Sequence, residues 1–130
     1  MAERIAARLD WLYVVTATLL TAHEIDSAYW REWTLFGLPG GIQLFVLANI
    51  PLSLLFLYGL VRVAREPKAG AWFAALLSAA GVAAFGIHMW LFWQGHTEFR
   101  LPVSVAVLVG ALVCSILLGW RSIGVLRSRG

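Results

Sequence analysis

His23, Glu24 and Asp26 are the residues of this sequence best suited to chemistry, because they place an imidazole and two carboxyl groups within four positions. They follow Leu19 and Leu20 in a stretch that otherwise suits a membrane. Ionisable groups are costly there, and those that occur usually mark a functional site. A helix places His23 and Asp26 on one face, one turn apart. We therefore expect His23 to act as a base or metal ligand, with Asp26 orienting it and Glu24 as an acid or further ligand.

Two later apolar segments carry polar residues at a comparable depth. At about 1.5 Å per residue, His23 and Asn49 lie about 18 Å from the inner interface and His88 about 25 Å from it. Trp30 shares the face of His23. We expect His23 and His88 to converge in the outer half of the membrane, near Asn49. Asn49 is interpreted either as a hydrogen-bonding link between helices or, with Trp30, as a contact for a bound cofactor or ligand.

The side chains in this set fit more than one chemistry. His23, Asp26 and His88 are candidate ligands for zinc or another divalent metal ion, which binds histidine and carboxylate groups. Without a metal, His23, Glu24 and Asp26 suit general acid–base catalysis. Residue 27 is serine, so the sequence lacks the second histidine of an H-E-x-x-H metalloprotease motif. In either case we expect a lipid-soluble substrate that enters from the outer leaflet.

Two other functions remain open at this stage. A haem could be held between His23 and His88 as axial ligands, although their difference in height of about one turn counts against it. The polar cluster could instead only fix helix packing in a non-enzymatic structural or partner-binding subunit. Arg31 and Glu32 are expected to meet headgroups and water.

The elements that must position these residues are membrane helices. The 130 residues are 61% apolar and only 13% charged, with a mean hydropathy of +0.80. Soluble domains are about 45–50% apolar and about 25% charged. Four stretches suit spanning helices of about 20 residues. We predict an all-α, integral membrane four-helix bundle that forms a single domain over residues 1–130, with spans at about 11–30, 42–61, 71–93 and 103–120.

The basic residues predict an orientation. Eight of them fall on one side of the predicted membrane and two on the other. Positively charged loops favour the cytoplasm, so we expect both termini there, in a bacterial cytoplasmic (inner) membrane with lipid as the surrounding partner. The basic residues form no patch interleaved with aromatic residues, which argues against nucleic-acid binding. The two groups are Arg4, Arg8, Arg62, Arg65, Lys68, Arg121, Arg127 and Arg129 on the inner side, and Arg31 and Arg100 on the outer side.

The block "AHEIDSAYWREW", followed by "LPGGIQLF", resembles an uncharacterised bacterial family of small four-helix integral membrane proteins. The resemblance covers nearly the whole chain and implies the same fold, but no substrate. The chain is also distantly similar to a family named for a His-x-x-Glu-Glu motif. Asp26 and Ser27 stand here where that motif has its two glutamates.

Overall fold

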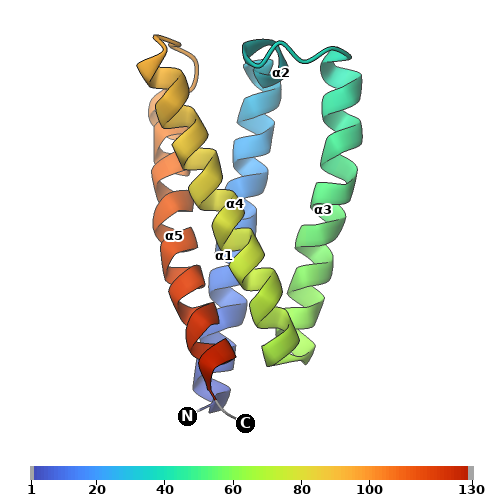
Figure 1. The fold of residues 1–130 in the computed structure, drawn as a ribbon, viewed down its shortest axis with the longest axis vertical. Helices are drawn as coiled ribbons and strands as arrows, with labels where there is room; N and C mark the ends of the chain where they lie inside the picture. Colours follow the sequence, from blue (N-terminus) through green and yellow to red (C-terminus); the bar gives the residue numbers. More distant parts are fainter. Residues whose placement is uncertain (1, 129–130) are drawn as a thin grey trace.

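The computed structural model describes residues 2–128, with side chains from residue 9 onward. Four long helices run the length of the molecule, and a fifth, of one turn, lies at one end (Figure 1). They are α1 (Ala2–Tyr29), α2 (Glu32–Leu35), α3 (Gly41–Arg65), α4 (Pro67–Trp93) and α5 (Pro102–Arg127). The start of α1 and the end of α5 lie at the opposite end of the molecule from α2. The described residues form no strand, so the all-α prediction is confirmed.

The prediction of four helices is wrong in number, because α2 forms a separate turn between the first two long helices. The long helices also extend beyond the predicted spans: α3 continues past residue 61 and α5 past residue 120. The predicted limits followed membrane thickness, whereas helical hydrogen bonding continues through arginine-rich ends that favour helix. The side chains of Arg4 and Arg8, and Arg129 as a whole, lie outside the described part of the chain.

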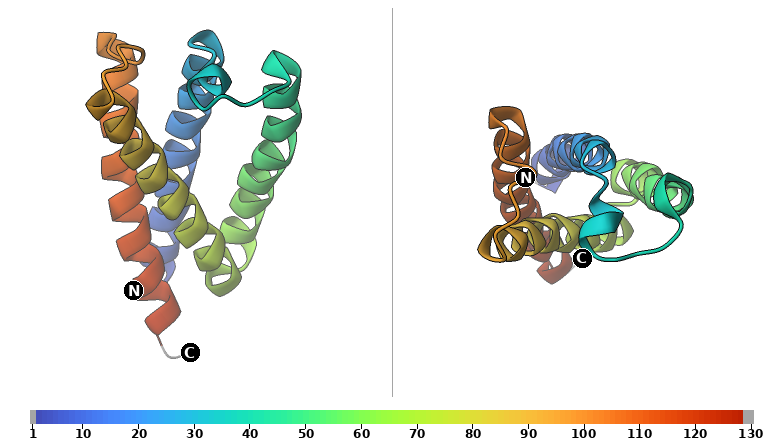
Figure 2. Two further views of the ribbon diagram at one scale, coloured as in Figure 1. Left: turned by 45° about the horizontal axis from the view of Figure 1, so that its top comes forward. Right: turned by 90° about the horizontal axis from the view of Figure 1, so that it is seen from above.

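Three of the helices, α3, α4 and α5, are long and apolar enough to cross a membrane. Helix α3 lies at the edge of the group formed by the long helices (Figure 2). It buries only Phe56, Gly59 and Val63. A helix that exposes apolar residues on most of its surface suits a lipid environment, because water would not tolerate a patch of that extent.

Small residues bring α4 and α5 close together. Ser78 of α4 donates a hydrogen bond from its hydroxyl group to the carbonyl oxygen of Ser115 on α5, at 2.6 Å. Gly81 faces the Ser115 side chain, and a methyl group at Gly81 would overlap it. Packing of small residues with a hydrogen bond between helices is the usual means of association in lipid, where apolar burial gives little driving force.

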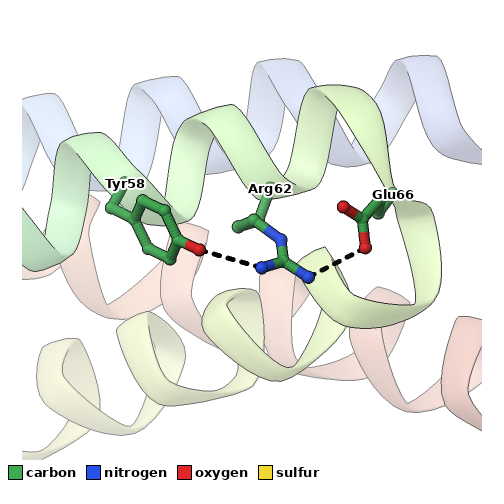
Figure 3. Close-up of polar contacts among 3 residues, drawn as sticks. All are labelled: Tyr58, Arg62 and Glu66. Atoms are coloured by element: carbon green, nitrogen blue, oxygen red, sulfur yellow. Dashed lines mark hydrogen bonds and ion pairs between the residues drawn. The ribbon is translucent and has the colours of Figure 1, made fainter.

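The turn between α3 and α4 is held by polar contacts at the end of α3. Arg62 donates hydrogen bonds to the Tyr58 hydroxyl group at 2.9 Å and to a Glu66 carboxylate oxygen at 2.8 Å (Figure 3). Glu66 is exposed, so solvent screens this ion pair and it contributes little to stability. Steric contact constrains this turn more strongly than the ion pair does, because Gly70 packs directly on the backbone of Val63.

We predict that Gly70→Ala destabilises the protein. A Cβ atom at Gly70 would lie 2.6 Å from the backbone nitrogen of Val63, and backbone cannot rotate away as a side chain can. Overpacking of this kind costs about 1–3 kcal/mol. Thermal unfolding in a fixed detergent would measure the loss. Gly86→Ala is the matched control on α4, because nothing lies within 4 Å of a Cβ atom there. Equal stability of the two variants would contradict the prediction.

Candidate metal centre

Side chains from three helices meet at the end of the bundle that carries α2. His23 of α1, Glu32 of α2 and His88 of α4 each offer one ligand atom, and these atoms all lie within 4.8 Å of one another. The two imidazole rings are in edge contact, with centroids 4.6 Å apart. Nε2 of His88 lies 3.8 Å from Oε1 of Glu32. We call this group, His23, Glu32 and His88, the candidate metal centre.

The backbone of α4 sets the protonation of one ring nitrogen of His88. Nδ1 of His88 lies 2.8 Å from the carbonyl oxygen of Ala84, one turn earlier. A carbonyl oxygen only accepts, so Nδ1 carries the hydrogen atom. In the neutral ring Nε2 then keeps a free lone pair, and it faces Glu32. A histidine that donates its other nitrogen to a backbone carbonyl is the usual arrangement of a metal ligand.

His23 also offers a nitrogen atom without a partner. Its Nδ1 is buried and makes no hydrogen bond to any described residue, as is true of Nε2 of His88. Nε2 of His23 lies 3.5 Å from the Ser27 hydroxyl oxygen, which is long for a hydrogen bond. Both histidines are almost completely buried. Leaving such atoms unpaired costs about 1–3 kcal/mol each, so the centre favours occupation by something that pairs with them.

Glu32 reaches the centre because the chain breaks at Arg31. On an uninterrupted helix, nine residues beyond His23 correspond to about two and a half turns, which would put Glu32 on the opposite face. Arg31 instead adopts the left-handed conformation, with φ of 53°, and α2 starts again in a new direction. Seen from above, α2 lies over the bundle near α1 and α4 (Figure 2).

Glu32 was not among the predicted site residues, and the expectation that it meets headgroups and water is wrong, because its side chain is only 16% exposed. No glycine or asparagine at position 31 signals the left-handed turn. Trp33 then anchors α2, since it is buried and packs on Phe45 of α3 with ring centroids 5.4 Å apart.

Phe99 closes the centre from the loop between α4 and α5. Its ring centroid lies 4.3 Å from that of His88 and 5.9 Å from that of His23, and the side chain is almost completely buried. Phe99 has a φ of 65°, which is strained for an aromatic residue. Its ring replaces water beside the histidines, and charges interact more strongly where water is excluded. This residue was also missed, because loop conformation at position 99 leaves no pattern in the sequence.

The remaining predicted site residues surround the centre without supplying its ligand atoms. The Glu24 carboxyl group lies next to the Asn49 side chain of α3 and within electrostatic reach of Glu32. Asn49 itself donates a hydrogen bond to the Phe45 carbonyl oxygen at 3.1 Å. Trp30 approaches Phe99, with ring centroids 6.3 Å apart, and its indole nitrogen is buried without a partner among the described residues.

Asp26 lies on another side of α1 from the candidate metal centre. It lines a groove between α1 and α5 and forms no hydrogen bond or ion pair with His23 among the described residues. Glu32, and not the predicted Asp26, is the carboxylate that lies with the two histidines. The His23 and His88 rings touch, so the centre does not suit the predicted haem either, whose macrocycle must lie between its two axial histidines.

The fold and centre define a helical protein with membrane-type helices and a buried histidine–glutamate group. The chain belongs to a family of unknown function, DUF6713, whose model matches residues 9–125. This agrees with the resemblance to an uncharacterised family. A search of curated proteins and a search of solved structures each found no match.

We predict that substitutions at Arg31 change the stability of the protein according to how readily the new residue adopts the left-handed conformation. Arg31→Gly relieves the left-handed conformation and should stabilise the protein by about 1 kcal/mol, whereas Arg31→Val should destabilise it by about 1–3 kcal/mol. The measurement is unfolding of each purified variant in the same detergent. Arg31→Ala shows what loss of the charge contributes, and it should lie between the other two. If Arg31→Val matched Arg31→Gly, the left-handed turn would not constrain α2.

Proposed function

We propose that this chain is an integral membrane protein that binds one divalent metal ion through His23, Glu32 and His88. Zinc is the ion that suits this ligand set best. The observation that carries the proposal is the convergence of three ligand atoms within 4.8 Å, two of them belonging to buried histidines with unpaired nitrogen atoms. Ligands around a tetrahedral ion with bonds of about 2.0–2.2 Å lie about 3.4 Å apart. Small rotations of the three side chains would bring their ligand atoms, which now lie within 4.8 Å of one another, to this separation.

The ligand set favours catalysis over a purely structural role. Two histidines and one glutamate leave a fourth position free, as in catalytic zinc sites, whereas structural sites use four protein ligands. Such an ion supplies Lewis-acid polarisation or activates water. Glu24 lies beside the centre and serves as the proton acceptor or donor, with Asn49 orienting its carboxyl group. Because the centre lies between apolar helices, the proposed substrate is a lipid-soluble molecule.

Metal content tests the proposed centre directly. Protein loaded with zinc and passed into metal-free buffer should retain about one equivalent per chain, measured by elemental analysis. His23→Ala, His88→Ala and Glu32→Gln should each weaken affinity by at least about 100-fold, because loss of an outer partner alone costs about 10–100-fold. His96→Ala is the control, since His96 pairs with Glu98 in the neighbouring loop. Absence of bound zinc in loaded wild type, or retention by all three variants, would contradict the proposal.

We also propose that α1 is a fourth membrane span beside α3, α4 and α5. The four long helices then cross a bacterial cytoplasmic membrane with both termini inside and the α2 end outside. The support is the charge distribution, which puts Arg62, Arg65 and Lys68 at the end opposite α2.

Single cysteines test this orientation. In a Cys114→Ser background, Leu38→Cys should react with a membrane-impermeant maleimide on intact cells, and Lys68→Cys should react only after lysis. Both positions are exposed, so access depends on the side of the membrane rather than on burial. The labelled fraction on a gel is the readout. Labelling of position 68 on intact cells would contradict the orientation.

A further inference from the structure

The end of the molecule opposite α2 carries one exposed aromatic ring on each of the four long helices. Each of these side chains is more than half exposed. At about 1.5 Å per residue, each lies within about 14 Å of the helix end opposite α2. Amphipathic rings near one end of a helix group are typical of a membrane–water interface. The four residues, which we call the aromatic belt, are Trp11 of α1, Tyr58 of α3, Trp72 of α4 and Trp120 of α5.

Charge is separated between the two ends of the molecule. Among the side chains that the structure describes, five basic and two acidic residues lie toward the end with the aromatic belt, whereas two basic and four acidic residues lie toward the α2 end. Only the belt end therefore has an excess of positive charge that attracts anions. The belt end has Arg62, Arg65, Lys68, Arg121 and Arg127 with Asp10 and Glu66, and the α2 end has Arg31 and Arg100 with Glu24, Asp26, Glu32 and Glu98.

Two arginine side chains connect this charge to the aromatic belt. The guanidinium carbon of Arg62 lies 5.7 Å from the centre of the Tyr58 ring, and that of Arg121 lies 5.6 Å from the centre of the Trp120 ring. A guanidinium group over an aromatic face is attracted to it. The contacts hold both positive charges at the level of the belt, which is where the headgroups of a surrounding membrane lie.

The turn between α3 and α4 leaves two further positive charges without a partner. Glu66 is the acidic residue of this turn, and Arg62 binds its carboxylate at 2.8 Å (Figure 3). Arg65 and Lys68, on either side of Glu66 in the chain, are exposed and form no ion pair with a described residue. Lys68 precedes Trp72 of the aromatic belt by one helical turn. The turn thus presents two free cations beside an exposed indole ring.

We propose that this end of the protein binds an anionic phospholipid, with its phosphate group at Arg65 and Lys68 and its acyl chains along the helices beyond Trp72. The proposal rests on the membrane-spanning arrangement but not on the metal centre. A zwitterionic phospholipid has no net charge, so it gains less from the two cations. A soluble polyanion meets the cations but leaves the aromatic belt in water. An anionic phospholipid matches both the charges and the belt.

The α2 end of the molecule supplies a matched comparison. The guanidinium carbon of Arg100 lies 5.5 Å from the centre of the Phe92 ring. This pair repeats the combination of a cation with an aromatic ring, but at the end where acidic residues outnumber basic ones. Neutralising Arg100 should therefore leave the lipid preference of the protein unchanged.

Competition between two lipids tests the proposal. The full chain in dodecylmaltoside is mixed with equal amounts of phosphatidylglycerol and phosphatidylcholine that have the same acyl chains, and native mass spectrometry counts each bound lipid. We expect at least about fivefold more bound phosphatidylglycerol, because each basic residue near a lipid surface raises affinity for anionic lipid by about that factor. Added salt should reduce the preference, since it screens exposed charges. This comparison needs no variant.

Variants then assign the preference to the turn between α3 and α4. The double variant Arg65→Gln, Lys68→Gln should lower the ratio of the two lipids to about one, and both side chains are exposed, so folding should not suffer. Arg65→Lys keeps the charge and should keep the preference, as should Arg100→Gln. Zinc content of the double variant should equal that of wild type, so this proposal can fail without the metal centre failing.

Three results would overturn the proposal. They are equal binding of the two lipids by wild type, a preference that survives in the double variant, and displacement of phosphatidylglycerol by soluble glycerol phosphate, which has the charge without the chains. Binding of neither lipid would contradict the membrane-spanning arrangement as well.

Discussion

The need to pair buried polar atoms governs this structure more than any single apolar contact. Helices of the kind found in lipid make their backbone hydrogen bonds internally, so the buried polar atoms that still lack a partner belong to side chains. Two of them are ring nitrogens of the touching residues His23 and His88, which lack hydrogen-bond partners among the described residues. The Ala84 carbonyl oxygen fixes one proton and thereby leaves the opposite nitrogen of His88 available. Both rings are almost completely buried, so the free nitrogen of His88 is shielded from bulk water.

Helical periodicity and depth were enough to anticipate part of this arrangement. The positions of His23 and His88 along parallel helices predicted that they converge, and the rings are in contact. Gly81 of α4 lies against Ser115 of α5, a close approach that small residues allow between membrane helices. These features follow from repeats of one turn along regular helices, which a sequence expresses directly.

The residues that complete the centre could not be found in the same way. Glu32 and Phe99 both lie outside the long helices, and each depends on a non-glycine residue with positive φ, Arg31 in one case and Phe99 itself in the other. Such conformations are imposed by surrounding packing rather than by local preference. Asp26 could not be placed correctly for a different reason. Its spacing of one turn from His23 puts both residues on α1, but it does not show which helix packs beside Asp26, and that helix is α5 rather than α4.

The three side chains of the centre come from α1, from the turn after it, and from α4, which is separated from them in the chain by the whole of α3. During synthesis the first two are therefore present long before the third. A nascent chain holding only its first hairpin has two of the three side chains of the centre, His23 and Glu32. The complete group exists only after the second hairpin has packed against the first, so the proposed metal binding requires a chain whose helices have already assembled.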